Sequence, residues 1–156
     1  MSRRHAELDL EHFLPYRLSV LSNRVSNAIA RAYSERFQLS ITEWRVIAVL
    51  GRYPELSANE VAQRTAMDKV AVSRAVAKLI ESGRLRRETH DDDRRRSVLQ
   101  LSEAGFQIYD EIVPFALGFE RRLLEGMDES ERNLLFRLLD KLDDLELRAE
   151  AEPPPG

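Results

Sequence analysis

Residues 57–102 read SANEVAQRTAMDKVAVSRAVAKLIESGRLRRETHDDDRRRSVLQLS, and this segment carries the strongest signals of the fold. Within it, Ser57 and Glu60 stand at the spacing that lets each side chain cap the other residue's exposed backbone amide at the start of a helix. The pair therefore predicts a short helix over about residues 57–65.

A second helix is predicted after the short segment Ala66-Met67. Asp68 is a favourable residue for capping a helix start, and the helical run 69–82 is followed by Gly83, which suits the left-handed position after a helix. This run is amphipathic at helical spacing. Its apolar stripe consists of Val72, Ala75, Val76, Leu79 and Ile80, and its other side carries Lys69, Val70, Ser73, Arg74, Ala77 and Lys78.

The polar side of the second helix has the residue types that read DNA bases. Lys and Arg suit guanine edges or phosphates, Ser serves either, and the small Val70 and Ala77 allow close approach and contact with thymine methyl groups. An ordinary amphipathic helix at the protein surface would show the same pattern, because Lys and Arg are common there. The helix by itself therefore leaves both interpretations open.

A short charged hairpin is predicted after Gly83. Residues 85–89 and 97–101 have the pattern of two strands, with Leu99 and Leu101 on one face, and a polar tip over residues 90–96 joins them. Three aspartates followed by three arginines at the tip could place a guanidinium in the narrow minor groove of DNA. Charge runs are also common in solvated loops, but helix, turn, helix and basic hairpin in direct succession favour a winged helix that binds duplex DNA.

The segment MDKVAVSRAVAKLIESGRLRRETHDDDRRRSVLQLSEAG, residues 67–105, resembles the MarR family of bacterial transcriptional regulators. The resemblance covers about residues 8–147. Its most specific part is Asp93-Arg94-Arg95 followed by Leu99-Gln100-Leu101-Ser102 and Gly105, which matches the family's wing pattern. Ser102 replaces the usual Thr and keeps the hydroxyl cap.

The resemblance implies a sequence-specific, ligand-responsive repressor that acts as a homodimer on a pseudo-palindromic operator. It implies that Arg95 is the wing-tip arginine of the minor groove, that Asp93 orients it, and that Ser73 and Arg74 occupy recognition-helix positions. Together with the residue pattern, it predicts DNA contacts by Ser57, Lys69, Val70, Ser73, Arg74, Lys78, Arg87, Asp93, Arg94, Arg95 and Arg96.

The distribution of charge agrees with a DNA-binding surface although the formal net charge is −3. Residues 63–98 carry ten Lys or Arg against six Asp or Glu, whereas residues 99–156 carry six against fourteen. Such segregation allows a basic surface to face phosphate while an acidic one points away.

The helical patterns before and after the predicted winged helix indicate an all-helical dimerisation lobe. Residues 15–38 are predicted to form one long helix. Its apolar stripe is expected in the first place to belong to the core and consists of Leu18, Leu21, Val25, Ile29, Ala32 and Phe37. A helix over 43–52, begun by Ser40 or Thr42, is expected to support the helix-turn-helix. Residues 103–125 and 129–146 are further helices, and the second carries more leucine than one small lobe buries, namely Leu134, Leu135, Leu138, Leu142 and Leu145.

The predicted fold class is mainly α with a small β-hairpin wing. The expected domain is single, over residues 1–148, because 156 residues make one domain of ordinary size. It contains a winged helix-turn-helix at about 40–102 and dimerisation helices at about 8–38 and 103–147, and residues 149–156 are expected to be a disordered tail.

The residues that several classes of function require are missing from this sequence. No cysteine is present, so neither disulfides nor thiolate sensing is available. His5, His12 and His90 are scattered and no phosphate-binding glycine loop appears, so we expect no enzyme, no metal and no cofactor. No signal peptide or membrane-spanning run is present, so a cytoplasmic location is expected.

An effector site is the least specified feature of the sequence. The family resemblance implies a small aromatic or phenolic effector, and His12, Arg17 and Trp44 are the residues we nominate to bind it. Arg17 could pair with a carboxylate and Trp44 could stack on a ring. Arg17 as a surface or dimer-interface ion-pair partner and Trp44 as a core residue are the competing interpretations.

Two other functions use the same fold. A winged helix can be a protein-interaction module, because fold does not fix function, but interaction variants tend to expose apolar or acidic residues where this chain has Lys69, Ser73, Arg74 and Lys78. A general architectural DNA binder would bind with little sequence preference and strong salt dependence. The net acidity and the compact wing argue against that alternative.

Overall fold

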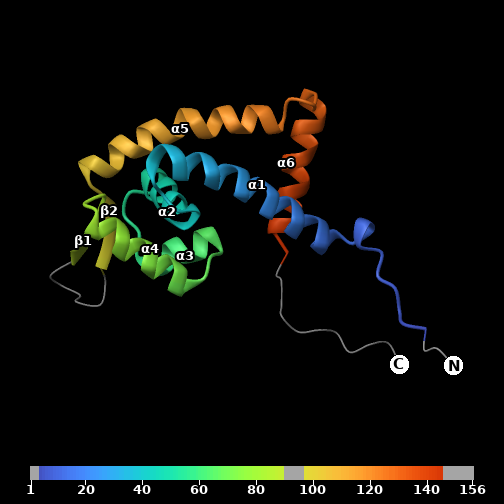
Figure 1. Cartoon of the computed structure of the whole chain (residues 1–156), viewed down its shortest axis with the longest axis horizontal. Coiled ribbons are helices and arrows are strands. Elements are labelled where there is room, and N and C mark those ends of the chain that lie inside the picture. Colours follow the sequence, from blue (N-terminus) through green and yellow to red (C-terminus); the bar gives the residue numbers. More distant parts are fainter. Residues whose placement is uncertain (1–3, 90–96, 146–156) are drawn as a thin grey trace. The chain divides into compact units, whose positions relative to one another are not determined.

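The computed structural model describes residues 4–89 and 97–145, and its elements follow the predicted order (Figure 1). The chain is mainly helical, with a small antiparallel hairpin, as predicted. The elements are η1 (Leu10–His12), α1 (Leu14–Phe37), α2 (Ile41–Arg52), α3 (Ala58–Thr65), α4 (Lys69–Glu81), β1 (Leu85–Thr89), β2 (Ser97–Leu101), α5 (Glu103–Leu123) and α6 (Glu129–Asp143).

The chain divides into two compact units, Met1–Pro114 and Phe115–Gly156, so that the boundary falls inside α5. In the first unit α2 packs against α1, α3, α4 and β2, and α4 also packs against α3 and β1. The side chains between these elements form the core, and the largest fully buried ones are Tyr33, Leu39, Ile47, Leu50, Leu79, Leu99 and Ile112. This core holds the helix-turn-helix and the hairpin in one unit.

Side-chain caps set the helix starts, as the sequence predicted. The Ser57 hydroxyl accepts from the Glu60 amide at 3.2 Å, and the Glu60 carboxylate accepts from the Ser57 amide at 3.3 Å, which completes the capping box. The Asp68 carboxylate caps α4 by accepting from the Ala71 amide at 3.1 Å. Of the two residues proposed to start α2, Ser40 is the cap, and α2 begins two residues earlier than expected.

The hairpin strands have the predicted bounds, and their register runs from Leu85 opposite Leu101 to Thr89 opposite Ser97. Leu99 and Leu101 are buried on one face, and the Leu99 amide also donates to the Leu56 carbonyl at 2.7 Å. The hairpin tip, residues 90–96, lies outside the described residues. The hairpin is therefore attached to the core by its buried leucines and by the hydrogen bond to Leu56, which precedes α3.

Ser102 joins the end of the hairpin to the start of α5. Its hydroxyl donates to the Gly83 carbonyl at 2.6 Å and accepts from the Gly105 amide at 3.1 Å. The hydroxyl cap expected at this position is therefore present. It ties the left-handed turn at Gly83, with φ of 76°, to the helix that leaves the hairpin.

The apolar stripe predicted as core on α1 is buried only toward its C-terminal end. Leu18 and Leu21 are exposed in the single chain, whereas Val25, Ile29 and Ala32 are half-buried and Phe37 is buried. Tyr33, which the stripe omitted, is 1% exposed. The expectation of core was wrong for Leu18 and Leu21, because the part of α1 that joins the core is its C-terminal part, where Tyr33 and Phe37 are buried.

In the second unit, α6 has no buried residue. Its leucines expose large parts of their side chains, with Leu134 at 45% and Leu138 at 47%. Helix α5 ends at Leu123 and α6 at Asp143, slightly before the predicted ends. Such apolar exposure along one helix is typical of a surface that is covered in an assembly.

Among the described residues, no helix is long and apolar enough to cross a membrane.

Candidate nucleic-acid interface

Helix α4 has two chemically different faces. Val72, Ala75, Val76 and Leu79 are buried, and Ile80 is half-buried at the edge. The opposite face is exposed and carries the predicted base-reading residues Lys69, Val70, Ser73, Arg74, Ala77 and Lys78. The structure therefore holds α4 by its apolar stripe and leaves its basic, hydrogen-bonding face open.

The turn before α4 sets the direction of this helix. Ala66 ends α3 in the left-handed conformation, with φ of 51°, and the Met67 amide donates to the Ala62 carbonyl at 3.3 Å. Such a conformation is unusual for a residue other than glycine, so an alanine at this position carries no signal for it. It lets Asp68 cap α4 immediately after α3 ends.

The other predicted contact residues have different positions. Ser57 is half-buried and its hydroxyl is engaged in the α3 capping box, so its first role is structural. Arg87 is exposed on β1, opposite Leu99 in the strand register. The wing-tip residues Asp93, Arg94, Arg95 and Arg96 lie outside the described residues.

Lys78 has a second environment that the sequence did not reveal. It lines a pocket of about 490 Å³ together with Gln38, Ser40 and Glu43. Glu43 is only 6% exposed, although its place in an amphipathic helix start gave no sign of burial. Lys78 therefore lies on the open face of α4 and also borders a pocket of mixed polar and apolar lining at the start of α2.

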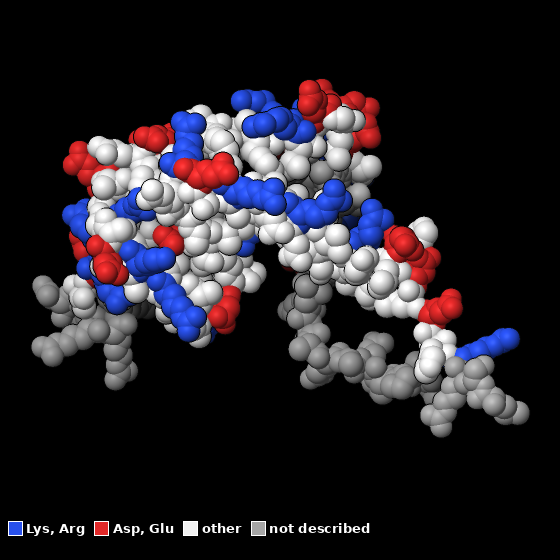
Figure 2. Space-filling model, viewed as in Figure 1, with Lys and Arg blue, Asp and Glu red and all other residues white. Residues whose placement is uncertain are grey.

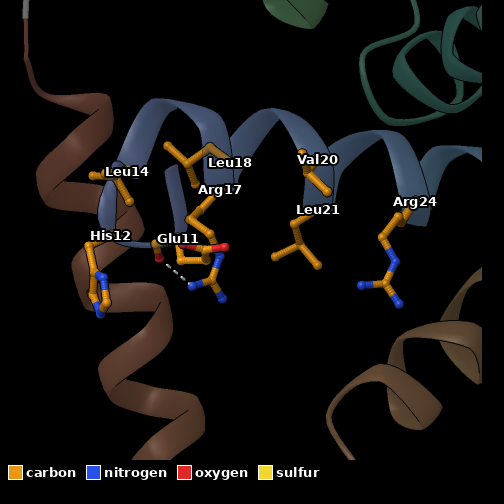
Figure 3. Close-up of a pocket in the computed structure, with 8 residues that line it drawn as sticks. All are labelled: Glu11, His12, Leu14, Arg17, Leu18, Val20, Leu21 and Arg24. Atoms are coloured by element: carbon orange, nitrogen blue, oxygen red, sulfur yellow. Dashed lines mark hydrogen bonds between the residues drawn. The ribbon is translucent and has the colours of Figure 1, made fainter. Parts of the chain in front are cut away.

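Two of the three nominated effector residues come together, and the third lies elsewhere. His12 and Arg17 line a pocket of about 400 Å³ on α1 and the segment before it, with Leu14, Leu18, Leu21 and Arg24 among its other lining residues (Figure 3). Arg17 Nη1 donates to the Glu11 carbonyl at 2.9 Å, and His12 Nδ1 lies 2.8 Å from Asp9 Oδ2. Trp44 does not line this pocket.

Trp44 packs inside the first unit. Its ring stacks on Tyr33, with centroids 4.8 Å apart and planes at 19°, and its indole nitrogen is buried without a hydrogen-bond partner among the described residues. Burial raises the pKa of the Tyr33 phenol above its ordinary value of 10.0. The packing role weighed for Trp44 is the one the structure shows.

Charge on the molecular surface is mixed. Figure 2 shows blue Lys and Arg side chains following the line of α1, and both blue and red side chains around α3, α4 and the hairpin. Helix α4 is packed into the core by its apolar side, and its opposite side exposes basic residues next to the hairpin. A helix-turn-helix with such a face, followed by a two-stranded wing, defines a winged helix DNA-binding protein.

Comparison with known proteins gives the family. The family model described as MarR family matches residues 37–96. A MarR/EmrR family transcriptional regulator from Acinetobacter sp. ADP1 is 32% identical with a TM-score of 0.83, and the match covers 88% of this chain and 96% of that chain. The chain belongs to the MarR family of transcriptional regulators.

Two further relatives agree. The HTH-type transcriptional regulator BilQ of Clostridium symbiosum is 28% identical over 96 residues, which are 62% of this chain and 67% of BilQ. The HTH-type transcriptional regulator PecS of Dickeya dadantii is 26% identical over 141 residues, which are 88% of this chain and 84% of PecS. The protein is thus a DNA-binding transcriptional regulator and not an enzyme.

Proposed function

We propose that the protein is a ligand-responsive repressor that binds a pseudo-palindromic operator as a homodimer. The observation that carries this proposal is the exposed face of α4, where Lys69, Ser73 and Arg74 stand opposite a buried apolar stripe. In this proposal α4 enters the major groove, Val70 contacts thymine methyl groups, and Lys78 and Arg87 contact the DNA at the edges of the site. The role proposed for Ser57 is a phosphate contact made from its capping position.

The wing part of the proposal rests on the sequence resemblance. Arg95 enters the minor groove, Asp93 orients it, and Arg94 and Arg96 add positive charge at the same tip. The described strands support this arrangement because Thr89 and Ser97, which flank the tip in sequence, pair with each other, and β1 packs against α4.

Dimerisation is supported by apolar surface on both units. In the first unit, Leu8, Leu14 and Leu21 are each more than half exposed. In the second, Leu134 and Leu138 are about half exposed on α6. We propose that residues 8–38 and 103–147 are the dimerisation segments, that residues 40–102 are the DNA-binding segment, and that a two-fold axis places the two α4 helices one DNA turn, ~34 Å, apart.

Selection of duplexes from a random pool, followed by fluorescence anisotropy, tests this function. The enriched duplex is expected to bind about a thousandfold more tightly than a scrambled duplex, and light scattering of the complex is expected to give two chains per duplex. Equal, weak binding to both duplexes would support an architectural or protein-interaction role and contradict the proposal.

The effector proposal concerns the pocket on α1. Its lining combines apolar Leu14, Leu18 and Leu21 with charged side chains, namely Arg17 and Arg24 against one carboxylate, Glu11. The excess of cations beside an apolar wall suits a small aromatic carboxylate. Figure 3 shows the Arg17 and Arg24 side chains on the same side of α1. We propose that such a ligand changes the spacing of the DNA-binding segments in the dimer and thereby lowers operator affinity.

Benzoate in the anisotropy titration is expected to weaken operator binding by roughly 5- to 150-fold, the size of a typical coupling free energy of ~1–3 kcal/mol. Arg17→Ala and Arg24→Ala are expected to reduce this response, and phenol is the uncharged comparison. Arg31→Ala, on the same helix but outside the pocket lining, is the matched control. A benzoate effect on thermal stability with unchanged operator affinity would refute the mechanism.

A further inference from the structure

Two arginines share one exposed tyrosine at the junction of α2 and α3. The Arg64 guanidinium carbon lies 3.9 Å from the centroid of the Tyr53 ring, and that of Arg52 lies 5.0 Å from it. All three residues are exposed, Arg52 is the last residue of α2, and Tyr53 is its C-cap. We call these three residues the Tyr53 cluster.

Among the described residues, no ion pair neutralises the charge of Arg52 or Arg64. Over the described residues, the one ion pair within 4 Å joins His12 and Asp9, and no hydrogen bond from the Arg52 or Arg64 side chain is found. A guanidinium that stacks on a ring keeps its N–H donors pointing outward in its own plane. The cluster therefore presents two oriented groups of donors to whatever lies beside it.

One member of the cluster, Arg64, lies on the helix of the motif that crosses the DNA backbone, and the other two lie at the end of α2. In helix-turn-helix proteins the second helix enters the major groove while the first helix crosses the backbone. Helix α3 is that first helix, packs directly on α4, and has Arg64 as its one basic residue. Side chains on a helix point back toward its N-terminus, and Arg64 accordingly reaches Tyr53, which precedes α3 in the chain.

We propose that the Tyr53 cluster is a phosphate clamp, in which Arg52 and Arg64 bind backbone phosphates next to the bases that α4 reads. Planar guanidinium groups match phosphate oxygens in pairs of hydrogen bonds. The stacking on Tyr53 reduces the ordering that binding would otherwise require. Such contacts position α4 on the duplex and carry no sequence information themselves. This inference rests on the proposed operator binding and adds residues that the sequence did not nominate.

The test is the salt dependence of binding to the enriched duplex, measured by anisotropy on the full-length protein. Arg64→Ala and Arg52→Ala are each expected to lower the steepness of log affinity against log salt by about one for each bound chain. Their affinities are expected to fall similarly on all operator variants. Tyr53→Leu is expected to lose about two- to fivefold in affinity, the equivalent of an exposed cation–π contact, while keeping the wild-type slope.

Two controls match these variants. Arg36 also lies over an aromatic ring, 5.6 Å from the centroid of Phe37, but belongs to α1, so Arg36→Ala should leave the slope unchanged. Tyr53→Phe keeps the ring and should bind like wild type. Circular dichroism melts confirm that each variant is folded.

The outcomes separate the clamp from the proposed function. If wild type selects no duplex, the operator proposal fails and the clamp fails with it. If wild type binds selectively but Arg52→Ala and Arg64→Ala keep both its slope and its affinity, only the clamp is wrong. If Tyr53→Leu binds like Tyr53→Phe, the ring does not orient the arginines and the clamp as proposed is wrong.

Discussion

Replacing Arg74 by Ala is expected to weaken the free energy of operator binding by ~1–3 kcal/mol for each bound chain. One bidentate contact between an arginine and a base contributes ~1–3 kcal/mol of discrimination, and the proposed homodimer loses one at each half-site. Arg74 is exposed on the free face of α4, so the substitution should leave thermal stability nearly unchanged. Anisotropy titrations on the enriched duplex, with a melting curve of the same preparation, measure both quantities.

Operator variants separate a base contact from a phosphate contact at Arg74. If Arg74 pairs with guanine, the Ala variant should lose preference at one position of each half-site, and Arg74→Lys should recover little, because Lys lacks the planar pair of donors. Arg95→Ala is the comparison and should weaken all variants to a similar extent. A uniform loss for Arg74→Ala across the variants would assign it to phosphate.

Replacing Gly105 by Ala is expected to destabilise the fold by about 1–3 kcal/mol, the usual range for overpacking. A Cβ at this position would overlap the Arg84 carbonyl oxygen and would also lie 3.2 Å from Leu101 Cδ2. The Arg84 carbonyl has little freedom to move because it accepts from the Ser102 amide at 3.0 Å. Chemical denaturation monitored by circular dichroism measures the change.

Gly118 in the same helix is the matched control. A Cβ there would have Arg121 Nη2 at 3.7 Å as its nearest contact, which is ordinary van der Waals distance. Gly118→Ala should therefore stabilise the protein by roughly 0.5–1 kcal/mol, because glycine in a helix interior is less favourable than alanine. Equal effects of the two substitutions would show that helix propensity, and not the close approach to Arg84, governs Gly105.

Much of the DNA-binding segment could be predicted from the sequence because its signals are local. The capping pair Ser57–Glu60, the cap at Asp68 and the left-handed Gly83 act within a few residues of where they stand, and all three are found as expected. Both strands of the hairpin also have the predicted bounds. The helix bounds differ by a few residues at the ends, where capping competes with fraying.

The sites depend on contacts between distant parts of the chain and were less predictable. Trp44 was nominated with Arg17, but it stacks on Tyr33 and takes no part in the α1 pocket. The Tyr53 cluster joins residues of two helices and their link, and nothing in the spacing of Arg52 and Arg64 indicates that both contact the Tyr53 ring. Charged residues that are far apart in sequence form a site only when the packing of the chain brings them close together.

The order of the helices, their caps, the hairpin and the basic face of α4 follow from the amino-acid sequence, because periodicity and capping are properties of neighbouring residues. How much of the α1 stripe is buried depends on the packing of the whole chain. Leu18 and Leu21 remain exposed while Tyr33 is buried, and Glu43 is covered beside Lys78. The physical reason is that burial depends on whether another element packs against a face, and the pattern along one helix carries no information about that partner.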